Sequence, residues 1–228
     1  MPAPPDGYCR EFHEGLARVM PMATTGASPA RQPPGRVGFI GRSGSYAIPP
    51  RFDDAWDFAE GRAAVLQGGK WGFIDKSGRF AIVPRFESAS YFSGGVAAVT
   101  SRGKTVFIGT SGRPVFHAEY DDGAGFSEGL AAVKVGRKWG YIARSGRLAI
   151  GPAFESADSF MNGRACVAVG SKYGYIDRTG KFVVPPSYAY GHFFLGALAG
   201  VTQHPERSDG SGTGYLDRSG RVVLKPAP

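Results

Sequence analysis

The stretch Gly69-Lys70-Trp71-Gly72-Phe73-Ile74-Asp75-Lys76-Ser77-Gly78-Arg79 recurs, with variations, from near the N-terminus to the last ten residues. The other copies are recognised by the small residue and the glycine that close each one, at Ser43-Gly44, Ser111-Gly112, Ser145-Gly146, Thr179-Gly180 and Ser219-Gly220. The first four intervals are 34 residues each and the last is 40. A fixed period of this size indicates a repeat protein, in which one small unit is copied and stacked.

Each unit divides into three short segments, which in the second copy are Phe58–Val65, Lys70–Asp75 and Arg79–Phe86. The segments are too short for typical helices, are rich in aromatic and β-branched residues, and are bounded by glycine or proline. The sequence therefore predicts an all-β fold of six units, each of roughly 34 residues and three strands.

The turn between the second and third segments has a recognisable chemistry. Asp75 suits the first position of a type I turn, and Gly78 supplies the left-handed residue of a three-residue hairpin loop. A proline column near the end of the third segment suits an edge strand, where a missing N–H is tolerated. Its members are Pro50, Pro84, Pro152, Pro186 and Pro226. We expect a β-hairpin in every unit.

The second segment points to the core. Phe73 and Ile74 are adjacent, so they face opposite sides of a strand, and both columns are apolar in all six units. One face is expected to contact its own unit and the other a neighbour, while Gly72 leaves room for another backbone or ring to approach. We predict an open, curved or superhelical array, because propeller blades usually have four strands in about 40 to 45 residues. The six-fold count keeps a closed, propeller-like ring as the alternative.

The domain organisation follows from the repeats. A short tail at 1–7 precedes one repeat domain at 8–226, which carries loop insertions at 20–35 and 202–211, and a tail at 227–228 ends the chain. The third unit departs from the pattern, because Thr105-Val106 replace Trp-Gly, Gly109 replaces Asp and Ala118 replaces Pro.

Composition sets further bounds. The net charge of +8 permits binding to anionic surfaces or polymers without requiring it. Cys166 falls in a column of alanines and is expected to be buried, and two cysteines cannot form a disulfide framework or a zinc site. The sequence shows no secretory signal and no apolar run of membrane-spanning length, so a soluble, cytoplasmic protein is expected.

Lys70–Gly78, preceded by Phe58–Val65 and followed by Pro84-Arg85-Phe86, resembles the WG-repeat family of bacterial proteins. The resemblance covers roughly residues 8–226 and implies an all-β repeat fold with a binding or scaffolding role. It brings no catalytic residues. The residues that carry the repeat motif are Trp71, Gly72, Gly78, Trp139, Gly140, Gly146, Gly174, Gly180 and Gly220.

No catalytic arrangement stands out. The histidines His13, His117, His192 and His204 are scattered, and no His, Cys, Asp or Glu spacing suggests a metal site. A recurrent acidic column, at Asp53, Glu87, Asp121 and Glu155, is better explained by capped turns than by carboxylate catalysis. We expect neither an enzyme nor a cofactor.

Two basic columns flank the hairpin turn and form the candidate binding site. The column before the turn contains Arg42, Lys76, Arg144, Arg178 and Arg218, and the column after it contains Arg79, Arg113, Arg147, Lys181 and Arg221. Regular stacking in one continuous sheet would space successive pairs by about 14 Å and align them as a basic stripe. Alternatively, these cations are simply solvated and deter edge-to-edge aggregation.

The leading functional hypothesis is a non-catalytic module that binds another protein through its repeat surface. The alternative is an anionic-polymer or nucleic-acid binder that uses the basic stripe, with affinity that falls as salt rises. A carbohydrate site would depend on exposure of Trp56 and the tyrosines, whereas most aromatic columns are expected in the core.

Overall fold

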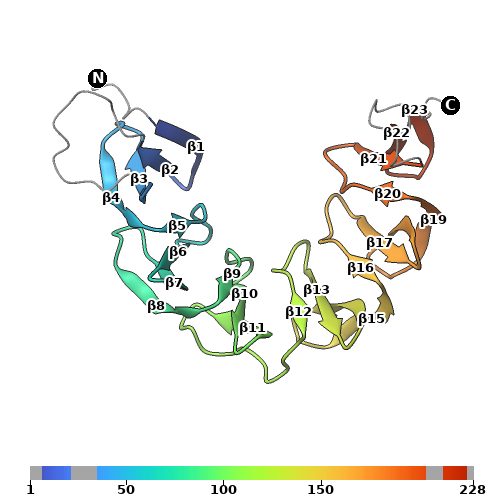
Figure 1. The fold of residues 1–228 in the computed structure, drawn as a ribbon, viewed down its shortest axis with the longest axis horizontal. Helices are drawn as coiled ribbons and strands as arrows, with labels where there is room; N and C mark the ends of the chain where they lie inside the picture. Colours follow the sequence, from blue (N-terminus) through green and yellow to red (C-terminus); the bar gives the residue numbers. More distant parts are fainter. Residues whose placement is uncertain (1–6, 22–34, 204–212, 225–228) are drawn as a thin grey trace. The chain divides into compact units, whose positions relative to one another are not determined.

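A computed structural model describes residues 7–21, 35–203 and 213–224. Within these ranges the regular secondary structure is entirely β, and the strands form six antiparallel sheets, one for each repeat (Figure 1). Contacts divide the chain into two compact units, residues 1–117 and 118–228, each with three sheets. The all-β repeat fold predicted from the sequence is confirmed.

The strands of the first unit are β1 (Gly7–His13), β2 (Leu16–Pro21), β3 (Val37–Gly41), β4 (Tyr46–Phe52), β5 (Asp54–Ala55), β6 (Ala63–Gln67), β7 (Lys70–Ile74), β8 (Phe80–Phe86), β9 (Ser88–Ala89), β10 (Val96–Ser101) and β11 (Lys104–Gly109). Those of the second unit are β12 (Asp122–Gly123), β13 (Leu130–Val135), β14 (Lys138–Ala143), β15 (Leu148–Phe154), β16 (Ser156–Ala157), β17 (Ala165–Val169), β18 (Lys172–Ile176), β19 (Phe182–Tyr188), β20 (Tyr190–Gly191), β21 (Leu198–Thr202), β22 (Thr213–Asp217) and β23 (Val222–Leu224).

The sheets are separate, and the structure adds a short strand to the three that were predicted. The five later sheets each begin with a strand of two residues, such as β5, which pairs with β6. One residue, Asp53, separates β4 from β5. Its N–H already donates to the carbonyl of Leu66 in β6, at 2.9 Å. Because β4 and β5 belong to different sheets, the spacing of 14 Å that assumed one continuous sheet does not apply.

The first predicted strand is mostly a turn. The N–H groups of Ala59 and Arg62 donate to each other's carbonyls, at 2.8 and 3.1 Å, around Glu60 and Gly61. Both central residues have positive φ, 53° and 73°, as a two-residue hairpin turn of type I′ requires. Strand β6 therefore begins only at Ala63, five residues later than the sequence pattern indicated.

The hairpin turn between the second and third predicted strands is confirmed. The N–H of Gly78 donates to the Asp75 carbonyl at 2.9 Å, the N–H of Asp75 donates to the Arg79 carbonyl at 2.9 Å, and Gly78 has φ of 82°. The Asp75 carboxylate also accepts bonds from the N–H and hydroxyl of Ser77, at 2.9 and 2.6 Å. Those hydrogen bonds lower the pKa of Asp75 below its ordinary value, the hydroxyl being the largest cause.

The glycine after the tryptophan allows the last strand of each sheet to approach closely. A Cβ on Gly72 would lie 2.6 Å from both the Ile82 carbonyl oxygen and the Pro84 nitrogen. Pro84 lies within the outermost strand β8, where its missing N–H leaves no ladder bond unmade. Pro50, Pro152 and Pro186 occupy the same place in β4, β15 and β19, whereas Pro226 lies outside the described residues.

The third sheet lacks this glycine. Val106 replaces it, and the sheet has three strands, in the order β11-β10-β9. The chain beyond the turn still begins to pair, through the Ile108–Pro114 bridge and a bond of 2.9 Å from the Val115 N–H to the Phe107 carbonyl. It then leaves the sheet without forming the long outer strand found elsewhere.

The core lies between neighbouring sheets. Phe73 packs on Phe92 of the following sheet with ring centroids 4.8 Å apart, while Ile74 belongs to the cluster that β7 shares with the preceding sheet. The same aromatic contact recurs as Phe39–Phe58, Tyr141–Phe160 and Tyr175–Phe194. The expectation that this strand buries both faces is confirmed. Within each unit, neighbouring sheets thus stabilise one another, as in other repeat folds.

Carboxylates join the first turns of neighbouring sheets. Glu60 accepts hydrogen bonds from the N–H groups of Gly94 and Gly95 in the next turn, the latter at 2.7 Å. Glu14 and Glu128 make the same contact, each at 2.9 Å, with Gly61 and Gly163. Two other repeats have glycine at the position of these glutamates. Gly94 and Gly196 therefore lack a side chain for this contact.

The predicted insertions at 20–35 and 202–211 lie largely outside the described residues, as do the tails at 1–7 and 227–228. The final predicted strand is present as β23, over Val222–Leu224.

Candidate binding surfaces

The basic column before the hairpin turn is used within the fold. The Lys76 ammonium lies 3.1 Å from the Glu14 carboxylate of the preceding sheet, and Arg178 donates to the Glu128 carbonyl at 2.5 Å. Arg218 donates to the Asn162 side chain at 3.1 Å and to the Gly196 carbonyl. Arg42 and Arg144 lie over the rings of Phe12 and Phe126, at 5.7 and 5.1 Å. The side chains of this column therefore make contacts within the fold, either with turn residues or with phenylalanine rings.

The column after the turn is different. Its five side chains, those of Arg79, Arg113, Arg147, Lys181 and Arg221, are all exposed. Arg221 forms an ion pair with Asp217 at 3.2 Å, and the described residues offer no side-chain partner to the other four. The structure thus separates the two columns that the sequence analysis had joined as one stripe.

The residues of the repeat motif occupy structural positions. Gly140 and Gly174 repeat the close approach seen at Gly72, with a Cβ placed 2.6 and 2.5 Å from a strand carbonyl. The turn glycines have positive φ, and a Cβ on most of them would press on a side chain of the preceding sheet; they are Gly78, Gly146, Gly180 and Gly220. Trp71 and Trp139 are half-buried against core clusters.

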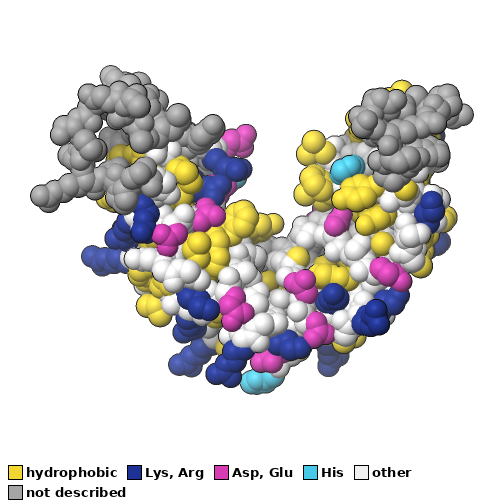
Figure 2. All heavy atoms as spheres, in the orientation of Figure 1, with side chains coloured by type: hydrophobic (Ala, Val, Ile, Leu, Met, Phe, Trp, Pro, Cys, Tyr) yellow, Lys and Arg dark blue, Asp and Glu magenta, His cyan; other side chains and the backbone are white. Residues whose placement is uncertain are grey.

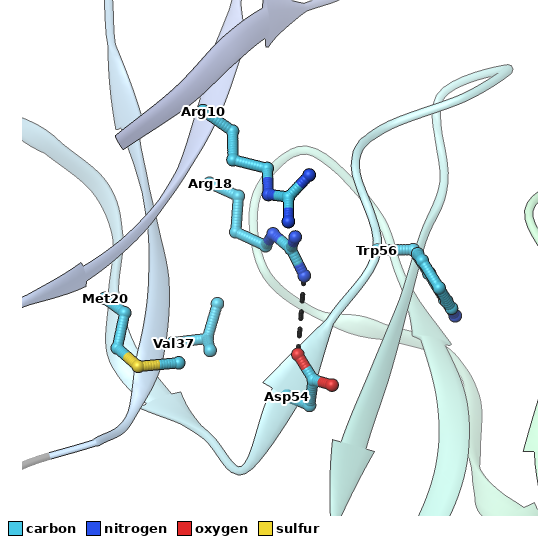
Figure 3. A pocket seen from close by; sticks show the side chains of 6 residues that line it. All are labelled: Arg10, Arg18, Met20, Val37, Asp54 and Trp56. Atoms are coloured by element: carbon cyan, nitrogen blue, oxygen red, sulfur yellow. Dashed lines mark hydrogen bonds and ion pairs between the residues drawn. The ribbon is translucent and has the colours of Figure 1, made fainter. Parts of the chain in front are cut away.

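A pocket of about 410 Å³ lies in the first unit and is lined by Arg10, Arg18, Met20, Val37, Asp54 and Trp56 (Figure 3). Arg18 forms its polar wall, with Nη1 3.4 Å from the Asp54 carboxylate and bonded to the Ala55 carbonyl. The Arg18 Nε also lies 3.8 Å from the Asp57 carboxylate. These contacts from β5 and the residues after it hold a guanidinium from β2 in place.

An exposed aromatic surface adjoins this pocket. The Trp56 side chain is 46% exposed, and its ring stacks on Trp71 with centroids 6.2 Å apart and an interplanar angle of 21°. Figure 2 shows hydrophobic side chains gathered over the short-strand edge of this unit. We call Trp56, Trp71, Arg10 and Arg18 the Trp56 surface.

Trp56 was named from the sequence only as a residue on whose exposure a carbohydrate site would depend, and its combination with Arg10 and Arg18 was not predicted. Arg10 and Arg18 lie in the first, irregular repeat. The contact of Arg18 with Asp54, 36 residues later in the chain, joins two separate sheets. One available signal was the column of Trp56, whose counterparts are Ser90, Ala124, Asp158 and His192. A column without a constant apolar type is not a core position.

The second unit contains a buried thiol beside tyrosines. Burial raises the pKa of Cys166 to about 12, so the thiol stays protonated and is a weak nucleophile. The hydroxyl of Tyr175 donates to the His192 carbonyl at 2.8 Å. Among the described residues no group of three His, Cys, Asp or Glu side chains could hold a metal ion. His204 lies outside them.

The protein family of this chain follows from a comparison with family models. A model of the WG containing repeat matches residues 38–71, 71–104, 107–139, 139–173 and 173–204. The chain belongs to the WG-repeat family. The family match covers the degenerate third repeat as well as the regular ones. In the described part of this WG-repeat chain, no helix is long and apolar enough to cross a membrane.

Solved structures with a similar fold are β-propeller-like repeat proteins. Hsv2 from Kluyveromyces lactis with its complete loop 6CD matches with a TM-score of 0.55 and 10% identity, over 93% of this chain and 74% of that one. A second structure, of Kluyveromyces lactis Hsv2p, matches with a TM-score of 0.50 and 11% identity. The match covers 72% of this chain and 59% of the Hsv2p chain. The dihydro-heme d1 dehydrogenase NirN matches with a TM-score of 0.52 and 14% identity, over 94% of this chain and 55% of the NirN chain. These similarities show the fold alone. A search of curated proteins finds no similar sequence.

Proposed function

We propose that this WG-repeat chain is a non-catalytic module that binds another protein through the Trp56 surface. The observation that supports the proposal is the Trp56 ring, which is nearly half exposed and yet fixed by its stack on Trp71. A large exposed ring that is already immobilised loses little side-chain entropy when a partner covers it.

The composition of the surface supports protein binding. Tryptophan and arginine are among the residue types most enriched at the energetic centres of protein interfaces. The Arg18 guanidinium is paired with Asp54, so it offers further donors without adding an uncompensated charge. The adjoining pocket is large enough to accept a side chain of a partner.

The chemistry of the titratable groups supports a non-catalytic role. A catalytic cysteine needs a lowered pKa, whereas that of Cys166 is raised. His13 lies 3.8 Å from Asp57, and nothing in the described residues arranges this pair beside a nucleophile.

The proposal is tested by pull-down from cell lysate with the wild-type chain, Trp56→Ala and Val83→Ala. Val83 is exposed on β8, the opposite edge of the sheet that carries Trp56, so its variant removes apolar surface elsewhere. A discrete protein retained by the wild type and by Val83→Ala but lost with Trp56→Ala would support the proposal. Equal retention by all three would refute the role of the Trp56 surface.

A second candidate function rests on the exposed column after the hairpin turn. Four cations there have no side-chain partner among the described residues, so an anionic polymer could neutralise them. The test is retention on heparin of the double variant Arg147→Ala with Lys181→Ala. The control is Arg137→Ala with Lys172→Ala, which removes the same charge from other exposed positions of the unit. Equal elution of both double variants would exclude a specific role for the column.

A further inference from the structure

The pocket that adjoins the Trp56 surface has a polar part and an apolar part. Its charged groups belong to Arg10, Arg18 and Asp54, and Figure 3 shows both guanidinium groups directed toward the same space. The other three lining residues are apolar, and they are Met20, Val37 and Trp56. A volume of about 410 Å³ accommodates more than a single functional group. The lining therefore matches a ligand that joins a charged group to an apolar body.

Arg18 keeps hydrogen-bond donors that the fold does not use. A guanidinium carries five N–H donors. Nη1 bonds to the Ala55 carbonyl and lies 3.4 Å from the Asp54 carboxylate, and Nε lies 3.8 Å from the Asp57 carboxylate. Nη2 makes no hydrogen bond with any described residue. The side chain is only 16% exposed and is held by these contacts, so a ligand that pairs with Nη2 meets a donor that is already in place.

The charge of the pocket favours a ligand with one negative charge. The lining contains two arginines and one aspartate, which leaves a net positive charge. A second aspartate, Asp57, lies close to Arg18, and its buried Oδ1 accepts no hydrogen bond from the described residues. A doubly charged phosphate would meet stronger repulsion from Asp54 and Asp57 than a carboxylate would. Because a guanidinium also binds carboxylates with good geometry, a carboxylate is the best-matched group.

The apolar part of the pocket continues onto the exposed Trp56 ring. Met20 at the end of β2 is also exposed, and the stack on Trp71 holds the Trp56 ring in place. A small carboxylic acid bound at Arg18 would leave this ring uncovered. A peptide segment instead offers side chains at successive positions, so that one can reach Arg18 while its neighbour covers the ring.

We propose that the partner of this chain presents a peptide segment in which a glutamate or aspartate lies next to a large apolar residue. The acidic side chain enters the pocket and accepts hydrogen bonds from Nη2 of Arg18, and the charge of Arg10 adds to the attraction. The apolar side chain packs on Met20 and Trp56. This inference rests on the proposed function, because it names the chemistry of the segment that the Trp56 surface binds.

Affinity selection from a synthetic peptide library tests the proposal. The library consists of random heptapeptides that are acetylated and amidated, so that no peptide carries a terminal charge, and the full chain is the bait. We expect the retained peptides to be enriched in sequences with an acidic residue beside an aromatic or large aliphatic residue. Fluorescence polarisation then measures the affinity of the most enriched peptide. Replacing its acidic residue by the corresponding amide should weaken binding by a factor of about 10 or more, because a charge-assisted hydrogen bond is lost.

Variants of the chain locate the site of binding. Arg18→Lys keeps the positive charge but removes the Nη2 donors, and Arg10→Gln removes an exposed charge. Both variants should weaken binding of the acidic peptide more than binding of its amide form. The matched control, Arg79→Gln, removes an exposed charge from a hairpin turn of the same unit and should leave the affinity unchanged. Circular dichroism checks that each variant is folded.

A library that yields no retained peptide, or retained peptides without an acidic residue, would overturn the proposal. So would equal affinity for the acidic and amide forms, or equal weakening by Arg79→Gln, which would indicate general attraction to the net charge of +8. Trp56→Ala separates this result from a failure of the proposed function. Peptides of another chemistry that are lost with Trp56→Ala would reject only the carboxylate, whereas peptides that Trp56→Ala still retains would reject both.

Discussion

The close approach at the motif glycines leads to a sharp prediction for Gly140→Ala. A Cβ there would lie 2.6 Å from the Ile150 carbonyl oxygen, 2.8 Å from the Pro152 nitrogen and 2.9 Å from the Gly151 carbonyl carbon. All three atoms belong to the backbone of β15, so no side chain can turn aside to relieve the contact. The strand must move, which weakens its pairing with β14.

The expected cost is at the upper end of that for overpacked cores, about 3 kcal/mol of unfolding free energy. For a chain of this length that corresponds to a fall in Tm of about 6 to 12 °C. Gly151→Ala is a matched control in the same strand pair, because a Cβ there would meet nothing within 4 Å and φ is not positive. That variant should stay within about 0.5 kcal/mol of the wild type.

The assay is urea unfolding followed by circular dichroism, with thermal melts in parallel. In the third sheet, Val106 occupies the glycine position and no outer strand is assigned in the described residues. A Gly140→Ala protein as stable as Gly151→Ala would refute the reasoning, because it would show that β15 does not depend on the missing Cβ.

Three further predictions follow from the described contacts. Glu60→Ala should lower the unfolding free energy by roughly 1 kcal/mol in urea titrations, because Gly95 loses a charged acceptor; Glu119→Ala, an exposed control, should not. The lowered pKa of Asp75 contributes stability that is present above its ordinary value near 3.8 and is lost as the pH falls through the lower folded-state value. Acid titrations of stability should therefore be flatter in Asp75→Asn, and an unchanged profile would contradict this. Cys166 should resist iodoacetamide at pH 8 until urea unfolds the chain, and rapid labelling of the native protein would be evidence against its burial.

The features that the sequence predicted are those set by local backbone chemistry. The turn at Asp75–Gly78 was predictable because an aspartate and a left-handed glycine specify it within four residues. The need for Gly72 was predictable for a similar reason, since a glycine between large residues in a strand marks a close approach.

The features that were missed depend on pairing between distant segments. Strand β5 is two residues long, too short for any periodic pattern, and it exists because β6 offers it a partner. The positive φ of Glu60 has no strong signal in its residue type. The contacts of the basic column before the turn could not be predicted, because they join residues such as Arg178 and Glu128, 50 positions apart.

The candidate binding surfaces also divide into one that local geometry explains and one that depends on distant contacts. The basic column after the turn is exposed, and the hairpin geometry alone accounts for that position. The Trp56 surface requires Arg18 of the first sheet to meet Asp54 of the second, which sequence spacing does not reveal.

The most direct test of the proposed function is pull-down with the purified chain at low and at high salt, with bound protein and nucleic acid both identified. Binding through the Trp56 surface predicts a discrete protein that remains at high salt, because apolar burial is not screened. Recovery of nucleic acid or mixed anionic material at low salt only would contradict it and would favour the basic column after the turn.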